Sequence, residues 1–251
     1  PPADGVEAAR GDRQLKEDVV IVGTGPGGAA AGRALAEAGL KVVFLEEGPP
    51  RSRFKKTYAN TARYHMQEAG SMVARGDGLK FIPVAAGRGV GGGSLINSAL
   101  AFRTPDSVLR GWVEKLETDV WGPEAMAPLF DEIGALLGIG PCTEANAGEN
   151  NRLIARGAAA FGYPGGYAPR NTPGCQGCGL CNYGCPVGGK ATVNLTLLPR
   201  ATDRGAIIQA DTRVTEILVE GGRAVGVRGR AYDPDDGSPG GEVTVRAETV
   251  V

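Results

Sequence analysis

The feature that most limits how this chain can fold is a glycine-rich turn set between two apolar runs. Residues 18–22 are mostly apolar, the turn GTGPGG follows at 23–28, and the alanine-rich residues 29–38 end at a glycine. A second apolar run covers residues 41–46. Short apolar runs are typical of buried parallel strands, and alanine favours a helix. The pattern therefore predicts a compact β-α-β unit within an α/β fold that has a parallel sheet.

The turn has the spacing of a dinucleotide-binding loop. Gly23, Gly25 and Gly28 form the pattern G-x-G-x-x-G directly after a strand and at the start of a helix. Such glycines allow a tight turn and bring the backbone close to a pyrophosphate at the helix N-terminus. Glu46 lies 23 residues after Gly23, near the spacing expected of a carboxylate that accepts ribose hydroxyls. Glu47 is the neighbouring alternative, and a structural turn beside a chance carboxylate is the alternative to the whole motif.

A second glycine-rich segment points to the kind of dinucleotide. Residues 88–97 have the sequence RGVGGGSLIN, which resembles the flavin-contacting segment of the glucose–methanol–choline (GMC) oxidoreductases. The sequence LEEG at 45–48 resembles the end of that family's FAD-binding opening, and WGP at 121–123 also matches. The strand–hairpin–strand pattern at 207–251 resembles the part of the family that returns to the FAD sheet. The resemblance covers most of residues 18–251 and implies a Rossmann-like FAD-binding domain.

The resemblance also implies which residues hold the cofactor. The first loop would contact the pyrophosphate, and Glu46 would bind the adenosine ribose. The second segment would lie near the pyrophosphate and the isoalloxazine. The backbone of Val214 would contact the adenine. Residues 95–98, where some family members link FAD to a histidine, contain none, so non-covalent FAD is expected. The expected cofactor-binding residues are Gly23, Gly25, Pro26, Gly27, Gly28, Glu46, Glu47, Arg88, Gly91, Gly92, Ser94, Asn97 and Val214.

Four of the five cysteines lie in one short segment. Cys175, Cys178, Cys181 and Cys185 have the spacing of a bacterial ferredoxin motif, which predicts a 4Fe-4S cluster. A 3Fe-4S cluster, or Cys142 as a distant ligand, is an alternative, because the fourth cysteine of that motif can serve another cluster. Disulfides, redox thiols or a zinc site are compatible with the same residues. A similar cysteine-rich run occurs in the GMC members that resemble long-chain alcohol oxidases.

Catalysis is expected to need residues beyond this chain. Enzymes of the GMC family use a histidine, with a second histidine or an asparagine, as the base beside the flavin near their C-terminus. His65 is the only histidine and is expected to be structural or on the surface. The sequence stops at Val251 within an apolar run, so we expect a missing catalytic part and a base located after Val251. Trp112 and Trp121 fall on helical patterns and are expected in the core.

The resemblance implies an enzyme that oxidises a small-molecule alcohol by hydride transfer to flavin. A long-chain, a sterol-like or a sugar alcohol is compatible with this expectation. The alternative is a flavin and iron–sulfur electron-transfer subunit without alcohol chemistry, which passes electrons to an acceptor protein. The remainder of the protein, or a second chain, would complete the fold in either case.

The rest of the chain predicts an antiparallel β-meander and part of a helical or substrate region. Helices are expected at 106–116, 123–137 and 150–161, and strands at 206–210, 214–220, 224–232 and 242–246. We expect an N-terminal arm at 1–17 and an FAD-binding domain at 18–251. That domain would contain dinucleotide and flavin motifs (18–102), a helical insertion (103–170), a cysteine-rich loop (171–189), and strands with the meander (190–251).

The net charge and the lengths of the apolar runs limit the classes of partner expected for this chain. The formal net charge is −1, which argues against a nucleic-acid footprint. No apolar run approaches the roughly 20 residues that a membrane-spanning helix needs. We therefore expect a soluble protein of the cytoplasm or periplasm, with no nucleic acid among its partners.

Overall fold

The computed structural model describes residues 6–8, 11–50, 54–78, 80–233 and 235–251. The chain clusters into two compact units. The first contains Pro1–Asn97, Leu180–Pro186 and Thr192–Val251, and the second contains Ser98–Gly179 and Val187–Ala191. The expected helical insertion lies within the second unit, whereas the cysteine-rich segment is divided between the two.

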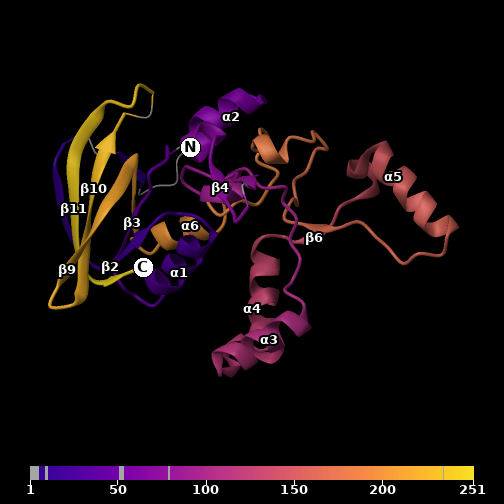
Figure 1. The fold of residues 1–251 in the computed structure, drawn as a ribbon, viewed down its shortest axis with the longest axis horizontal. Helices are drawn as coiled ribbons and strands as arrows, with labels where there is room; N and C mark the ends of the chain where they lie inside the picture. The colour runs from indigo at the N-terminus through magenta and orange to yellow at the C-terminus, as the bar shows by residue number, and fades with distance from the viewer. Residues whose placement is uncertain (1–5, 9–10, 51–53, 79, 234) are drawn as a thin grey trace. The chain divides into compact units, whose positions relative to one another are not determined.

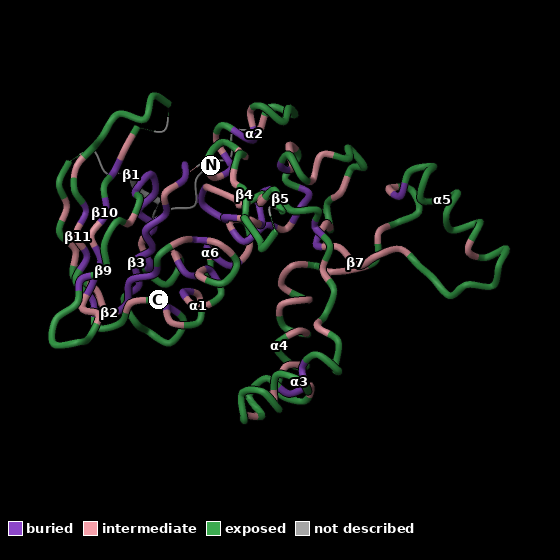
Figure 2. The backbone as a smooth tube through the Cα atoms, viewed as in Figure 1, coloured by how far each residue is buried: buried purple, intermediate pink, exposed green. Residues whose placement is uncertain are grey.

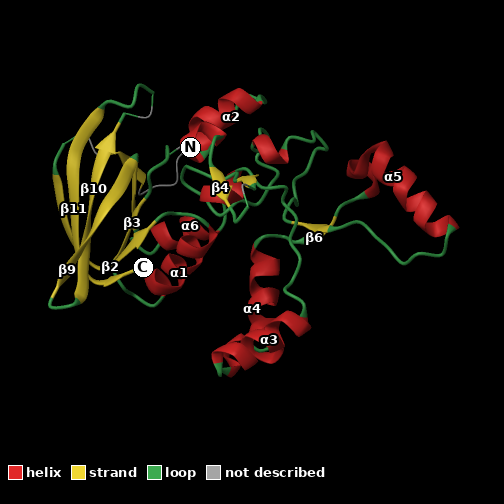
Figure 3. Cartoon of the chain, viewed as in Figure 1, coloured by secondary structure: helices red, strands yellow, loops and turns green. Residues whose placement is uncertain are grey.

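The first unit is built on a seven-stranded sheet in the order β1-β8-β3-β2-β11-β10-β9 (Figures 1 and 3). Neighbouring strands from β1 to β11 are parallel, and β9, β10 and β11 form an antiparallel meander. The mixed α/β fold and the meander are therefore confirmed. The strands are β1 (Val6–Ala8), β2 (Arg13–Val22), β3 (Val42–Leu45), β8 (Ile207–Ala210), β9 (Thr212–Glu220), β10 (Arg223–Tyr232) and β11 (Pro239–Val250).

Helix α1 (Pro26–Glu37) packs on one face of this sheet and contacts α6 (Leu197–Thr202). A Cβ added at Gly32 would lie 2.1 Å from Cζ of Phe44 and 2.9 Å from Cδ1 of Ile21. Gly32 therefore lets the helix approach β2 and β3 closely, as the third structural role of glycine in a dinucleotide-binding unit requires. The helix lies within the predicted β-α-β unit and starts three residues earlier than its alanine-rich stretch.

Alternate residues of the central strands divide between two cores because side chains in a strand alternate between faces. Ile21 and Phe44 face α1, whereas Val20 and Val43 pack with a cluster that includes Val245. Figure 2 shows buried positions concentrated in the central strands. The sheet is thus apolar on both faces, which explains the continuous apolar runs of the sequence.

The expected N-terminal arm is wrong for the described part of residues 1–17. Val6–Ala8 pairs in parallel with β8, and β2 already begins at Arg13. The first half of β2 pairs with β11 alone, since β3 joins only at Val19. Its polar side chains therefore reach solvent. This half of the strand has no apolar run in the sequence, so the sequence did not indicate it.

Short elements between β3 and the second glycine-rich segment had no clear sequence signal. Helix α2 packs its buried residues against that segment in a cluster of Ala62, Met66, Leu95 and Ile96. The second glycine-rich segment is therefore packed against α2 through apolar side chains. The elements are α2 (Tyr58–His65), η1 (Gln67–Gly70), β4 (Val73–Arg75), β5 (Phe81–Pro83) and η2 (Gly92–Leu95).

The second unit is mainly helical and has few buried side chains (Figure 2). Its elements are α3 (Asp106–Leu116), η3 (Asp119–Trp121), α4 (Pro123–Leu136), β6 (Gly140–Pro141), α5 (Glu144–Ala160) and β7 (Pro169–Arg170). The three expected helices are present. The expected core positions of Trp112 and Trp121 are wrong, since these side chains are 41% and 42% exposed. No helix among the described residues has the length and apolar character needed to cross a membrane.

We expect Gly32→Ala to lower the free energy of unfolding by about 1–3 kcal/mol, because the new methyl group overlaps Phe44 in a packed interface. Gly27→Ala in the same helix is the matched control, since its Cβ would meet open space. Urea denaturation of the cofactor-free protein, monitored by circular dichroism, measures the free energy of unfolding of both variants. Equal stability of the two variants would contradict the close packing of α1.

Candidate cofactor-binding site

The carboxyl ends of three parallel strands meet at one edge of the sheet. The amide of Gly23, which follows β2, donates to the carbonyl of Leu45 at 2.8 Å. The amide of Glu46, which follows β3, donates to the carbonyl of Gln209 on β8 at 2.9 Å. The glycine loop and the acidic residue predicted from sequence are therefore neighbours at this edge. Ligands of open α/β sheets bind at such an edge.

The first loop has a geometry suited to a phosphate. Gly23 has φ +96°, a left-handed conformation that favours glycine, and Gly28 packs against the Gly23 carbonyl. Gly25 caps α1 in an ordinary extended conformation, and Pro26 opens the helix. A Cβ at Gly25 or Gly27 would meet nothing within 4 Å. Neither packing nor backbone conformation requires glycine at these two positions, which leaves room for a ligand at the helix N-terminus.

The second glycine-rich segment lies against the first loop through backbone contacts. A Cβ at Gly92 would lie 2.6 Å from Cα of Gly25, and one at Gly48 would lie 2.0 Å from the Gly89 amide nitrogen. Gly91 has φ +115°, which again favours glycine. The two motifs recognised in the sequence are therefore brought together, and side chains at these contacts would separate them.

Glu46 connects both segments. Its side chain is only 4% exposed. One carboxylate oxygen accepts from the amide of Thr24 at 2.9 Å and from its hydroxyl at 2.6 Å, and the other accepts from the amides of Gly48 (2.9 Å) and Gly89 (3.1 Å). A carboxylate has about four lone-pair sites. Glu46 is therefore well satisfied by the protein itself, and its contact with a ribose stays a prediction.

Ser94 and Asn97 occupy different environments. The Ser94 hydroxyl is buried, donates to the Gly91 carbonyl at 2.6 Å, and accepts from the amide of Val193 at 3.2 Å. Ser94 thus holds the turn of its own segment. Asn97 lies beyond η2 and is exposed. Of these two predicted contacts, Asn97 is the exposed one and Ser94 the buried one.

A cavity of about 320 Å³ lies beside this edge and includes Glu47 and Arg88. The Arg88 guanidinium donates to the Tyr232 hydroxyl and stands 5.0 Å from the centre of its ring. Arg213 approaches Glu47 at 3.7 Å. Val214 follows on β9, pairs with Gly229, and packs its side chain against the core. The cavity joins residues from five separated segments, one of them in α2 and η1, and has both charges and an aromatic ring in its wall.

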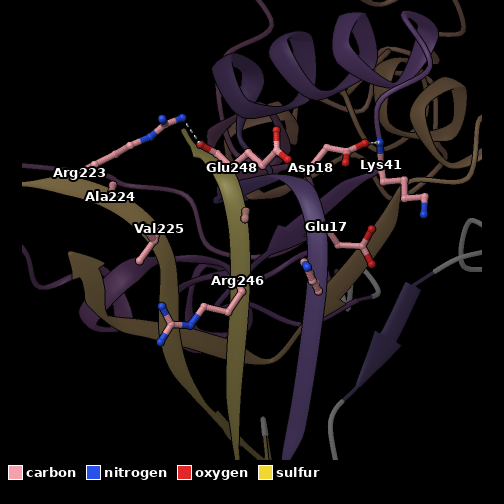
Figure 4. A pocket seen from close by; sticks show the side chains of 10 residues that line it. Glu17, Asp18, Lys41, Arg223, Ala224, Val225, Arg246 and Glu248 are labelled. Atoms are coloured by element: carbon pink, nitrogen blue, oxygen red, sulfur yellow. Dashed lines mark hydrogen bonds between the residues drawn. The ribbon is translucent and has the colours of Figure 1, made fainter. Parts of the chain in front are cut away.

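A larger cavity of about 590 Å³ lies at the other end of β3, beside Lys41 (Figure 4). The Asp18 carboxylate accepts from the Lys41 amide at 2.8 Å, and Arg223 donates to the Glu248 carbonyl at 3.2 Å. Its basic and acidic side chains are interspersed, so it has no strong field of one sign. Its position separates it from the glycine loops, and it is not the candidate cofactor site.

The four motif cysteines are divided between the two units. Cys175 and Cys178 belong to the second unit, and Cys181 and Cys185 belong to the first. In the described part of the chain, no three His, Cys, Asp or Glu side chains are grouped to hold a metal ion, and none of the cysteines forms a disulfide. The described residues therefore give no support to an iron–sulfur cluster, which stays a prediction from the spacing. The amide of Gly177 does approach the Cys175 sulfur at 3.3 Å.

His65 has a structural environment, as expected. The side chain is fully buried, its ring centre lies 4.6 Å from that of Phe54, and its carbonyl accepts from the Arg88 amide at 2.9 Å. His65 thereby supports the start of the second glycine-rich segment.

Thr24, Tyr232 and Arg213 escaped the sequence analysis although they lie at the site. Thr24 occupies a position where the dinucleotide pattern specifies no side chain. Tyr232 and Arg213 come from the meander, and only the sheet order brings them to the second segment. The sequence offered one signal for such a residue, which is that Thr24 places a hydroxyl inside the glycine loop.

Comparison with known sequences identifies the family. Residues 28–251 match the sequence pattern described as GMC oxidoreductase. The chain belongs to the GMC oxidoreductase family. It is 37% identical over 243 residues to an uncharacterized GMC-type oxidoreductase of Mycobacterium tuberculosis, covering 90% of this chain and 38% of that protein. It is 35% identical over 211 residues to a long-chain-alcohol oxidase of Arabidopsis thaliana, covering 81% of this chain and 28% of that protein.

Solved structures show the same fold. Pyridoxine 4-oxidase from Mesorbium loti matches 93% of this chain and 48% of its own, with a TM-score of 0.68 and 18% identity. Formate oxidase matches 93% of this chain and 44% of its own, with a TM-score of 0.64 and 15% identity. The chain thus spans less than half the length of these GMC relatives and of the two solved structures. The GMC family binds FAD, and the two glycine segments are the part of this chain that fits a dinucleotide.

We expect the Tyr232 phenol to ionise above its ordinary pKa of 10.0, because burial raises the pKa and the hydrogen bond from Arg88 offsets only part of this effect. The difference in tyrosinate absorbance between the wild type and Tyr232→Phe measures the ionisation. Arg88→Met should raise the pKa further, since it removes the opposing cation. Ionisation of Tyr232 at or below pH 10 would contradict the buried environment.

Proposed function

We propose that this chain binds FAD non-covalently at the edge formed by β2, β3 and β8, as part of an enzyme that oxidises an alcohol. The observation that carries the proposal is the open space at Gly25 and Gly27 in front of α1. This space lies beside a second glycine-rich segment that contacts the first. A helix N-terminus with freely approachable backbone favours a pyrophosphate.

Different residues of the chain would contact different parts of the cofactor. Residues 23–28 would hold the pyrophosphate, and Gly91, Gly92 and Asn97 would border the flavin side. The cavity beside Glu47, with Arg88 and Tyr232 in its wall, has the position expected of the adenosine end. The backbone of Val214 would complete it. Bound FAD would supply the acceptor for a hydride from the alcohol carbon.

The base for this chemistry would come from polypeptide outside the described residues. His65 is buried under the second segment and already in contact with Phe54, so it is poorly placed to receive a proton from a substrate. A histidine or an equivalent base from later polypeptide would take the hydroxyl proton. Among alcohols, we favour the long-chain class, since the relative from Arabidopsis thaliana is a long-chain-alcohol oxidase.

Further polypeptide would also cover the second unit. Helix α4 has no buried residue, and α3 has only Leu109. A unit of this size needs an apolar core to offset its conformational entropy. Large apolar side chains instead remain exposed, among them Leu100, Phe102, Trp112, Leu116, Val120, Trp121, Leu129, Leu153, Ile154 and Phe161. These support a proposal in which the rest of the protein, or a partner chain, packs on this unit.

We expect the chain to bind FAD and Gly27→Asp to weaken binding at least about tenfold, because a carboxylate would enter the space proposed for the pyrophosphate. Gly11→Asp is the control: it adds the same charge at another open glycine of the first unit. Quenching of flavin fluorescence during titration gives the affinities. Failure of the wild type to bind FAD, or equal affinity of both variants, would contradict the site.

The cysteine motif is a separate prediction, and the iron–sulfur electron-transfer alternative depends on it. If the ferredoxin spacing determines its chemistry, the purified protein contains iron and acid-labile sulfide, and Cys175→Ser lowers both. Cys142→Ser tests the distant-ligand alternative and leaves both unchanged if Cys142 is no ligand. Absence of iron and sulfide from the wild type would contradict the cluster.

A further inference from the structure

We propose that Thr24 is a positioning residue of the cofactor site, whose hydroxyl fixes the second glycine-rich segment against the first loop through Glu46. The inference rests on the proposed FAD site and assigns a role to a side chain that the dinucleotide pattern leaves undefined. Thr24 is fully buried although it lies in the middle of a ligand-binding loop. Its side chain therefore serves the interior of the protein, whereas Gly25 and Gly27 face open space.

The Thr24 hydroxyl makes two hydrogen bonds of opposite direction. It donates to the Glu46 carboxylate at 2.6 Å and accepts from the Gly91 amide at 3.1 Å. The Gly89 carbonyl is a more distant acceptor, at 3.4 Å. A hydroxyl has one proton and two lone pairs, so it can donate to a carboxylate and accept from an amide at the same time. Hydrocarbon side chains can do neither.

These bonds hold the part of the second segment that contacts the first loop. Gly91 is buried and left-handed, and the next residue, Gly92, lies against Gly25. Loss of the hydroxyl would leave the Gly91 amide without this acceptor and remove one donor from a buried carboxylate. Both groups would then seek other partners, because a buried polar group without a hydrogen bond is unfavourable. The segment from Gly89 to Leu95 would shift or become mobile.

Loss of the Thr24 hydroxyl would weaken cofactor binding more than it would weaken the packing of the sheet. The strands and α1 keep their own apolar contacts when Thr24 loses its hydroxyl, whereas the relative position of the two glycine segments changes. A ligand that contacts both segments needs them in one arrangement, and a less ordered site binds it more weakly. Serine satisfies the same geometry, whereas valine has nearly the shape of threonine without the hydroxyl.

The test compares Thr24→Val, Thr24→Ser and Thr61→Val in the full chain. Thr61 is the matched control, since it is also fully buried and its hydroxyl donates at 2.6 Å to the Tyr183 carbonyl. We expect Thr24→Val to raise the dissociation constant of FAD at least about tenfold. Thr24→Ser should stay within about twofold of the wild type. Thr61→Val should lower the stability of the cofactor-free protein while retaining its FAD affinity.

A second measurement does not depend on FAD. Hydrogen exchange of the cofactor-free protein should show faster exchange at residues 89–95 in Thr24→Val, but not in Thr24→Ser or Thr61→Val. Unchanged exchange in Thr24→Val, or unchanged affinity while the wild type binds FAD, would overturn the role of Thr24 and leave the proposed function standing. Absence of FAD binding by the wild type would overturn the proposed function as well.

Discussion

The buried carboxylate of Glu46 is the interaction on which the arrangement of the candidate site depends. A carboxylate removed from water needs hydrogen-bond donors, and Glu46 finds them in three segments, through Thr24, Gly48 and Gly89. These donors come from the loop after β2, the turn after β3 and the second glycine-rich segment. Satisfying one charge therefore brings together chain segments up to 65 residues apart, as the Thr24 to Gly89 contact shows.

Glycine makes this convergence sterically possible. The turn after β3 lies so close to the second segment that a Cβ at Gly48 would overlap the Gly89 backbone, and Gly92 meets Gly25 in the same way. Three backbone amides and the Thr24 hydroxyl then surround the carboxylate, and backbone rather than side chains borders the helix N-terminus. Charge and close approach depend on each other here: without the glycines the donors would not reach Glu46, and without Glu46 their amides would lack a buried acceptor.

The sequence predicted the elements that have a strong period or a motif and missed those that tertiary context determines. The β-α-β unit, both glycine segments and the meander follow from apolar runs and turn residues. The start of β2 at Arg13 was missed because its polar side chains remain solvated beside β11. Trp112 was placed in a core that the second unit lacks. No spacing rule could reveal that Thr24 bonds Gly91, since this contact depends on the position of a distant loop.

The difference between the two units bears on how the proposed activity is distributed. The cofactor segments stand on a sheet that is apolar on both faces, and their hydrogen bonds are satisfied within the first unit. Such a site is preorganised, so little ordering would oppose FAD binding. The second unit has helices without a core of their own. Under the proposed function, the cofactor is held by contacts already present in this chain, whereas substrate and proton transfer depend on polypeptide that packs on the second unit.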